Sequence, residues 1–437
     1  ISDGATLLID MNGFTLTEPL SIKGIGVSSG ANYEGAIKTL YGKNSITGNL
    51  TLLGNSRINI GAVYQVGNSS DSLNLSSINT GSSSAYELIL TSNVGTKVVG
   101  VISGNGSIIK EGLDTLVLSA INTYAGATLI NAGTVLISNK DALGSATAGT
   151  GSSSTTVGVN GGSGATLRVI GTNISSQLIP IPEYITINGT GIAATPGVIR
   201  LISGSGAATL SGVITVATAS RINSDAATNA LTIGTAGVTN TGGLTFGISN
   251  TGNISVTSII SGAGGITKDG TGTGRLVLGG ANTYQGATLV STGFLQITSS
   301  DALGSQTPGT LGYSTTTVSD GAALELNGTA AITIPEVILV NGNGVSGTPG
   351  AIRQIHATNN ATLNGAITAQ SGTATRINND ANAILTIGSG GITNTGGITF
   401  GNTTTGGITV TGIISGAGGI TKDGTGTGRL VLGGANT

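Results

Sequence analysis

The chain has 437 residues, of which 77 are glycine, 8% are charged and 3% are aromatic, and it contains neither cysteine nor tryptophan. Collagen is excluded because the glycines lack a three-residue period and there are only 7 prolines. The net charge is −2 and the 16 basic residues are scattered singly, so we expect no nucleic-acid partner. No apolar stretch approaches the roughly 20 residues that span a bilayer, so we expect no membrane-spanning segment here.

In chain order, the first third of the sequence consists of short apolar runs separated by Gly, Asn and Ser. Each run has three to five residues of alternating or continuous apolar character, which predicts β-strands. No stretch carries the 3.6-residue pattern and the caps of a helix. The expected strands of this part are residues 5–9, 50–53, 57–60, 73–75, 87–90, 116–118 and 134–137, and the same pattern continues to the end of the chain.

A long internal repeat organises the whole sequence. Residues 259–283 read IISGAGGITKDGTGTGRLVLGGANT and return letter for letter at 413–437, with a looser copy at 101–123. Lys110, Lys268 and Lys422 occupy one phase (268 − 110 = 158, 422 − 268 = 154), and Arg221 and Arg376 another (376 − 221 = 155). These spacings define super-repeats of about 155 residues at 1–145, 146–305 and 306–437. The sequence begins and ends within a repeat, so we expect it to be part of a longer polypeptide.

Short strands that recur over a long period predict a stacked, all-β architecture. A β-solenoid is favoured over a β-sandwich because glycine is frequent at turns and the buried Trp of immunoglobulin-like domains is absent. No charged or proline-rich linker separates the super-repeats, so we expect a continuous structure. With coils of ~20–25 residues, like residues would stack in ladders at about 4.8 Å. Tandem adhesin-type sandwiches are the alternative.

One segment carries a family resemblance. Residues 261–296 contain, in order, GITK at 265–268, GTG at 270–272, LVL at 276–278, GANTY at 280–284, GATLV at 286–290 and GFLQ at 293–296. This segment resembles the autotransporter-associated β-strand repeat, also called the passenger-associated transport repeat. The resemblance implies a right-handed parallel β-helix in a secreted or surface-displayed bacterial passenger, where the repeat is associated with export and folding of the stem. The copy at 104–123 departs from the pattern, with GLDT at 112–115.

Candidate catalytic and nucleotide-binding residues are few. His356 is the only histidine, and without a cysteine or an assignable Ser and Asp it makes no nucleophilic triad, so we expect a surface residue. The stretch from Gly342 to Gly347 matches GxGxxG, but Thr-Pro-Gly follows it instead of a helix, so a dinucleotide site is not predicted. The repeated pairs Lys268-Asp269 and Lys422-Asp423 are expected to be turn or ladder elements.

Two partial similarities concern repeats that bind calcium ions and repeats that bind ice. Residues 264–270 are similar to calcium-binding nonapeptide repeats, but those need an acid in every short repeat and this motif supplies one per super-repeat. Threonine ladders are typical of ice-binding solenoids, but the threonines of this chain are not confined to one alternating face. The sequence therefore predicts no catalytic, cofactor-binding or metal-binding residue and no cofactor.

The function predicted from the sequence is mechanical. We expect the nonenzymatic structural stem of a secreted or cell-surface bacterial adhesin or extracellular fibre. The alternative is a carbohydrate-binding or polysaccharide-cleaving β-helix, some of which use clustered Asp, Lys and Arg. The lack of cysteine is common in bacterial proteins exported through an oxidising compartment. Expected partners are further repeats or copies of the chain, and host, sibling-cell or glycan surfaces.

The repeat motif also predicts a register. Side chains alternate between the two faces of a strand, which places Leu276 and Leu278 inside and Arg275 and Val277 outside. The variant Leu276→Asp should then break the coil, because an unpaired charge in a thin core has no partner.

Arginines and chain ends give two further expectations. Arg221 and Arg376 each precede an aspartate by four residues (Asp225 and Asp380), and we expect structural roles for them, with exposed ion pairs contributing about 0–1 kcal/mol. Neither end of the sequence shows a cap, so we expect continuation into further repeats or end-to-end stacking through unpaired strand edges.

Overall fold

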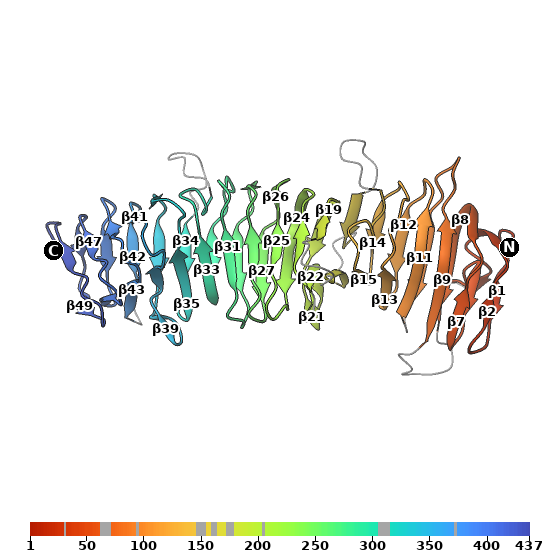
Figure 1. Cartoon of the computed structure of the whole chain (residues 1–437), viewed down its shortest axis with the longest axis horizontal. Helices are drawn as coiled ribbons and strands as arrows, with labels where there is room; N and C mark the ends of the chain where they lie inside the picture. Colours follow the sequence, from red (N-terminus) through yellow and green to blue (C-terminus); the bar gives the residue numbers. More distant parts are fainter. Residues whose placement is uncertain are drawn as a thin grey trace. The chain divides into compact units, whose positions relative to one another are not determined.

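Short β-strands stacked in parallel form the regular structure of the chain, described here from a computed structural model (Figure 1). The structure describes residues 1–29, 32–61, 71–92, 96–145, 154–158, 164–171, 179–202, 206–304, 315–370 and 374–437. Within these ranges there is no helix that is long and apolar enough to cross a membrane. The chain divides into two units, Ile1–Ile222 and Asn223–Thr437. The expected super-repeat boundaries fall at segments 146–153 and 305–314, which lie outside the described residues.

The first unit contains strands β1 to β24, coloured red to yellow-green in Figure 1. Their bounds are β1 Leu7–Ile9, β2 Thr15–Leu16, β3 Leu20–Gly24, β4 Ser28–Ser29, β5 Asn32–Tyr33, β6 Ile37–Thr39, β7 Lys43–Ile46, β8 Leu50–Ile60, β9 Ser72–Asn79, β10 Leu88–Ser92, β11 Thr96–Ser103, β12 Ile108–Glu111, β13 Thr115–Leu118, β14 Thr128–Ile130, β15 Gly133–Ile137, β16 Ser154–Val157, β17 Ala165–Val169, β18 Ile179–Ile181, β19 Tyr184–Gly189, β20 Gly191–Ile192, β21 Thr195–Pro196, β22 Ile199–Leu201, β23 Ala208–Leu210 and β24 Ile214–Ser224.

Two long ladders of parallel strands run through the first unit. One is β1–β6–β8–β10–β12–β14–β16–β19–β24, and the other is β2–β7–β9–β11–β13–β15–β17–β22. The strands expected at 50–53 and 57–60 are one strand, β8. The sequence between them looks like a turn, but Ser56 donates its backbone N–H to the carbonyl of Glu87 and the chain stays extended. Gly54 instead accommodates the side chain of Lys23 in the neighbouring strand, since a Cβ there would lie 2.8 Å from Lys23 Cγ.

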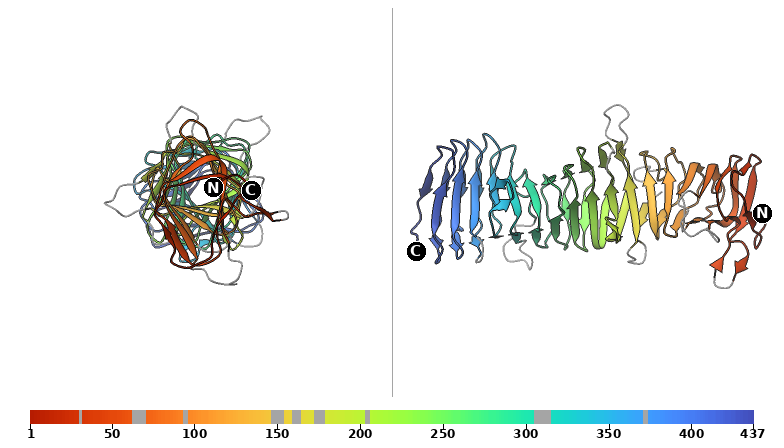
Figure 2. Two further views of the ribbon diagram at one scale, coloured as in Figure 1. Left: turned by 90° about the vertical axis from the view of Figure 1, so that its right-hand side faces the viewer. Right: turned by 90° about the horizontal axis from the view of Figure 1, so that it is seen from below.

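The second unit contains strands β25 to β50, coloured green to blue, and the right-hand view of Figure 2 shows its blue strands stacked side by side. Their bounds are β25 Leu231–Ile233, β26 Val238–Asn240, β27 Leu244–Ile248, β28 Ile254–Val256, β29 Ile260–Ser261, β30 Ile266–Asp269, β31 Arg275–Leu278, β32 Thr288–Val290, β33 Gly293–Ile297, β34 Thr316–Val318, β35 Ala322–Leu326, β36 Ile332–Ile334, β37 Ile338–Val340, β38 Gly344–Val345, β39 Thr348–Pro349, β40 Ile352–Gln354, β41 Ala361–Leu363, β42 Ile367–Ala369, β43 Thr375–Asn379, β44 Leu385–Ile387, β45 Ile392–Asn394, β46 Ile398–Asn402, β47 Ile408–Val410, β48 Ile414–Ser415, β49 Ile420–Asp423 and β50 Leu430–Leu432.

Three parallel ladders give the second unit the three walls of a β-helix. They are β27–β30–β32–β34–β37–β42–β45–β48, β25–β28–β31–β33–β35–β40–β43–β46–β49 and β36–β41–β44–β47–β50. Ile352, Ile377, Phe400 and Lys422 are successive register partners (377 − 352 = 25, 400 − 377 = 23, 422 − 400 = 22). These three coils of 22 to 25 residues match the expected ~20–25, whereas others in this unit range from 19 residues (297 − 278) to 29 (326 − 297). The fold of each unit is a parallel β-helix.

The interior of each unit is a narrow core of Val, Ile, Leu and Phe side chains. Strand residues alternate between buried and partly exposed, which is the period-2 pattern expected of strands with one face on the core. Leu276 and Leu278 are fully buried, whereas Arg275 and Val277 are partly exposed, so the predicted register is confirmed.

Candidate functional site

The lysine of the first two motif copies points into the core of the β-helix, whereas Lys422 of the third copy is exposed on β49. Lys110 lies on β12 between its buried register partners Leu90 and Ile130, and its own exposure is 1%. Lys268 occupies the same position on β30, between Phe246 and Val290, with 0% exposure. The sequence correctly predicts a ladder element at this position but does not predict that the ammonium group is buried.

Backbone carbonyl oxygens surround each buried ammonium group. Nζ of Lys110 donates to the carbonyls of Glu111 and Gly112, both at 2.7 Å, and of Ala132 at 3.3 Å. Nζ of Lys268 donates to the carbonyl of Asp269 at 2.8 Å and to that of Thr292 at 3.2 Å. In each of these two copies one acceptor is the residue directly after the lysine, at the end of the same strand, and another comes from the turn of the next coil. The side chain therefore joins two successive coils from the inside.

Burial also shifts the pKa values of ionisable side chains in the motif. Removal from water lowers the pKa of the Lys110 ammonium group to about 8, against the smaller opposing effects of the carboxylates of Asp114 and Glu111. Burial raises the pKa of the hydroxyls of Tyr124 and Tyr284 above their ordinary value. These hydroxyls stay neutral and take part in hydrogen bonds.

The asparagine of the motif links three coils. Oδ1 of Asn282 accepts from the backbone N–H of Ile260 in the preceding coil at 2.8 Å, and its Nδ2 donates to the carbonyl of Ala302 in the following coil at 2.6 Å. Asn122 makes the same pair of bonds, at the same two lengths, to Ile102 and Ala142. A buried amide with both ends bonded holds the two neighbouring turns in register.

The tyrosine and threonine of the motif form a further internal pair. Tyr124 Oη lies 2.6 Å from Thr128 Oγ1, and Tyr284 Oη lies 2.6 Å from Thr288 Oγ1. All four residues are buried. In the first unit Thr128 has Thr155 as its register partner in the next coil. The Oγ1 of Thr155 donates to the buried carboxylate of Glu183 at 3.1 Å.

Glycine at the end of the motif leaves room for the lysine. Gly293 has φ +71°, a left-handed conformation that side-chain-bearing residues rarely adopt, and a Cβ there would lie 3.1 Å from Nζ of Lys268. Every polar motif residue described so far is thus engaged with the protein's own coils.

The same segments are the ones that match a known family. A family model described as Passenger-associated-transport-repeat matches residues 108–137 and 266–297. The chain carries two passenger-associated-transport-repeats. Each repeat begins at the first residue of β12 or β30 and ends at the last residue of β15 or β33, so it is one set of four strands. The lysine and tyrosine bonds lie inside it, whereas the asparagine bonds reach residues of the coils on either side. The third copy of the motif, at 413–437, lies outside the matched residues. Comparisons with curated proteins and with solved structures found no match.

Charged side chains of the second unit form a network on the ladder that contains β31, β33, β35 and β40. The carboxylate of Glu325 is fully buried and accepts from Arg275 Nε at 2.6 Å, Arg275 Nη2 at 3.1 Å and Arg353 Nη1 at 2.9 Å. Arg353 also donates to Asp380 Oδ2 at 3.0 and 2.7 Å. The guanidinium of Arg275 lies 4.9 Å from the ring centre of Phe294. The charges of Arg275, Glu325 and Arg353 therefore link the coils of β31, β35 and β40, and the contact of Arg275 with Glu325 spans the coil of β33 between them.

Arg376 pairs with Asp423, not with Asp380, the aspartate four residues after it in the sequence. It donates to both carboxylate oxygens of Asp423, at 2.8 and 2.6 Å, and this contact holds the pKa of Asp423 below its ordinary value. Asp380, four residues after Arg376, pairs with Arg353 instead. Strand residues four apart lie on one face but about 13 Å apart along the strand, whereas neighbouring coils are much closer.

The remaining sequence candidates have structural positions. His356 is half-buried, and its Nδ1 accepts backbone N–H bonds from Thr358 at 3.4 Å and Asn359 at 3.2 Å. The GxGxxG stretch forms the antiparallel hairpin β38–β39. Among the residues that the structure describes, no cluster of three or more His, Cys, Asp or Glu side chains is placed to hold a metal ion. At residues 264–270 the carbonyl of Asp269 already accepts from the Lys268 ammonium group.

Threonines align more regularly than the sequence indicates. Thr333, Thr362, Thr386 and Thr409 are register partners on the ladder from β36 to β47. Other threonines, such as Thr288, are buried in the motif. These four threonines form one column with one residue per coil.

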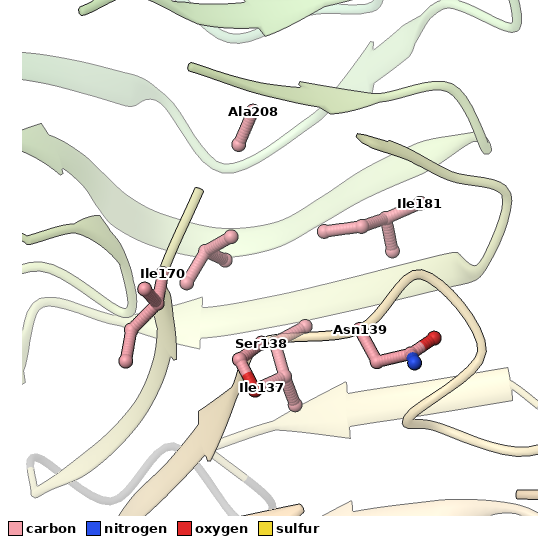
Figure 3. Close-up of a pocket in the computed structure, with 7 residues that line it drawn as sticks. Ile137, Ser138, Asn139, Ile170, Ile181 and Ala208 are labelled. Carbon is pink, nitrogen blue, oxygen red and sulfur yellow. The ribbon is translucent and has the colours of Figure 1, made fainter. Parts of the chain in front are cut away.

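Two hollows of the first unit differ in character. Figure 3 shows Ile137, Ile170, Ile181 and Ala208 around an internal gap that has no room for a water-sized molecule, so this gap is a packing feature. The second hollow is a surface groove of about 180 Å³ over β8, β9 and β11. Its lining residues are Asn49, Leu50, Thr51, Ser77, Ile78, Asn79, Val101 and Ser103.

Proposed function

We propose that this chain is a nonenzymatic structural stem in the passenger of a secreted or cell-surface bacterial protein, of the adhesin or fibre type. The observation that carries the proposal is that the lysine and asparagine of both passenger-associated-transport-repeats are engaged in bonds between coils. These side chains are buried and bonded to the chain's own backbone, so they are not presented to a substrate. The motif stabilises the stack of coils, and its role is mechanical.

The stacking bonds explain how a thin β-helix withstands load. Each coil contacts only its neighbours, so the strength of a β-helix is the sum of coil-to-coil interfaces. The motif adds two coil-to-coil contacts that an all-apolar coil lacks, the lysine cage and the asparagine bridge, and the tyrosine–threonine pair adds a bond within the coil. All three lie inside the core, where water does not compete for the hydrogen bonds.

Single-molecule pulling of the 437-residue chain tests this function. Each coil should be released as a discrete step, of roughly 80 Å for the coils of 22 to 25 residues between β40 and β49. The variant Asn282→Ala should lower the force at which the coils on either side of β31 are released. Asn250→Ala is the matched control, because the Asn250 side chain accepts the backbone N–H of the adjacent Thr251, a bond within its own turn, and the substitution keeps the backbone carbonyl that accepts from Gly274. A chain that extends without discrete resistance would contradict the mechanical role.

The polysaccharide-cleaving alternative has its own test. Hydrolytic cleavage needs a pair of carboxyl groups flanking the bond, and the lining of the groove over β8, β9 and β11 contains amide, hydroxyl and aliphatic side chains. Incubation of the chain with neutral and acidic polysaccharides should release no new reducing ends. Release of oligosaccharides by the purified chain would favour the enzyme.

A further inference from the structure

The groove over β8, β9 and β11 lies outside both repeats and has no part in the stem function. Its sides are two outward columns from three adjacent strands. Thr51, Asn79 and Ser103 are register partners in one column, and Ser77 and Val101 are partners in the other. The groove therefore crosses three coils at the strand spacing of about 4.8 Å, and it lies within the first unit.

The chemistry of the lining is neutral and rich in hydrogen-bonding groups. Asn49 and Asn79 supply carboxamides, and Thr51, Ser77 and Ser103 supply hydroxyls. Carboxamides and hydroxyls both donate and accept, as sugar hydroxyls do. Since the lining contains no ionisable side chain, the groove offers nothing to compensate a charged ligand.

Part of this lining is already held in place. The Ser77 hydroxyl donates to Asn49 Oδ1. Asn79 Oδ1 accepts the backbone N–H of Gly81 at 2.9 Å, so its Nδ2 is the donor that a ligand would use. Side chains fixed before binding lose less conformational entropy when a ligand arrives.

An apolar surface accompanies the polar columns. Val101 lines the groove and is 46% exposed. Ile121 is 58% exposed, and the next residue, Asn122, is hydrogen-bonded to the backbone of Ile102 beside Val101. Two exposed aliphatic side chains next to amides and hydroxyls match a pyranose ring, which has C–H faces and a rim of hydroxyls.

We propose that this groove is a binding subsite for a neutral oligosaccharide, with its chain running across β8, β9 and β11. One pyranose unit of a glycan chain is about as long as the spacing of one coil, so successive sugars meet successive coils. With a volume of about 180 Å³ the groove holds one sugar ring, and further rings lie on the surface beyond it. The subsite acts by recognition alone and is independent of the proposed stem function.

Saturation-transfer NMR with the full chain and cellotetraose, maltotetraose or mannotetraose tests the proposal. At least one of these neutral probes should receive saturation from the protein. The triple variant Thr51→Ala, Ser77→Ala, Ser103→Ala should weaken its binding at least tenfold. Thr51→Arg, which changes a single outward side chain and places a long cation over the groove, should do the same if the triple variant does not fold.

The second unit offers a matched control. Thr239 and Ser261 are register partners on β26 and β29, and Ser261 Oγ donates to the carbonyl of Val238 at 3.4 Å, as Ser103 Oγ does to that of Ile78. The variant Thr239→Ala, Ser261→Ala should bind the probe as the wild type does. Equal loss in this control, no transfer to any of the three probes, or stronger binding of an acidic probe such as tetragalacturonate would overturn the proposal. Failure of glycan binding would leave the pulling experiment unaffected.

Discussion

Leu276 provides the sharpest test of the packing inside the second passenger-associated-transport-repeat. Its side chain is fully buried on β31, between the register partners Ile254 and Leu295. Leu276→Ala removes three carbons, worth about 0.8 kcal/mol each in transfer from water. A cavity term adds to this because the neighbours are held by their own strands, so we expect a loss of about 3 kcal/mol, within the usual range for Leu→Ala.

Native-state hydrogen exchange with mass spectrometry is the suitable assay, because a stack of coils need not unfold in one step. If the free energy of local opening falls by about 3 kcal/mol, the amides of β28, β31 and β33 that exchange through local opening should exchange about 100-fold faster. Val277→Ala on the same strand is the control and should change these rates only slightly, because Val277 is partly exposed. Leu276→Asp should abolish protection of this coil. Equal effects of Leu276→Ala and Val277→Ala would refute the register.

Three electrostatic predictions follow from burial. Glu325→Gln should destabilise the second unit by about 3 kcal/mol in denaturant, since it leaves two guanidinium groups short of a buried partner; a change below 1 kcal/mol would contradict the network. Arg376→Ala should change the denaturation midpoint little, at most about 1 kcal/mol, because Asp423 is 46% exposed. For Lys110, the folded-state pKa of about 8 lies below the ordinary 10.5, so the unfolded chain binds more protons between these pH values and stability rises with pH across them. The free energy of unfolding of the wild type should therefore rise by up to about 3 kcal/mol relative to that of Lys110→Met between pH 8 and 10.5. If this stability difference falls over the same pH range, the pKa of Lys110 is not lowered in the folded chain.

Strand positions and register could be predicted from the sequence because they depend on local alternation. The run Arg275 to Leu278 has apolar residues at every second position, and a one-residue slip would turn Leu276 and Leu278 to the solvent. Coil length could also be estimated, since the spacing of apolar runs sets it. The prediction failed at β8, where a glycine that looks like a turn residue accommodates the side chain of Lys23.

Strand alternation predicts that Lys268 faces the core, but its charged side chain argues against burial. Ile266 faces the core, so alternation along β30 also turns Lys268 inward. Lysine is almost never buried without partners, and its acceptors are backbone carbonyl oxygens, of which that of Thr292 belongs to the next coil. Backbone acceptors leave no trace in the sequence, so the Lys-Asp pair predicts a turn or ladder element and not a buried ammonium group.

Long-range contacts explain what else the sequence did not predict. Arg275 and Glu325 are 50 residues apart, and their contact depends on how many residues each intervening coil takes. The groove over β8, β9 and β11 arises in the same way, from register partners that come from three separate coils. Neither arrangement has a local motif.

The central claim is that the repeat motif acts from inside the coil, and the lysines of the native chain test it without any substitution. Lys268 is fully buried, whereas the side chain of Lys140 is 52% exposed. An amine-acylating reagent followed by mass spectrometry should modify Lys140 fully while Lys110 and Lys268 remain unmodified, and all three should react in denaturant. Modification of Lys268 in the folded chain at the rate of Lys140 would contradict the account.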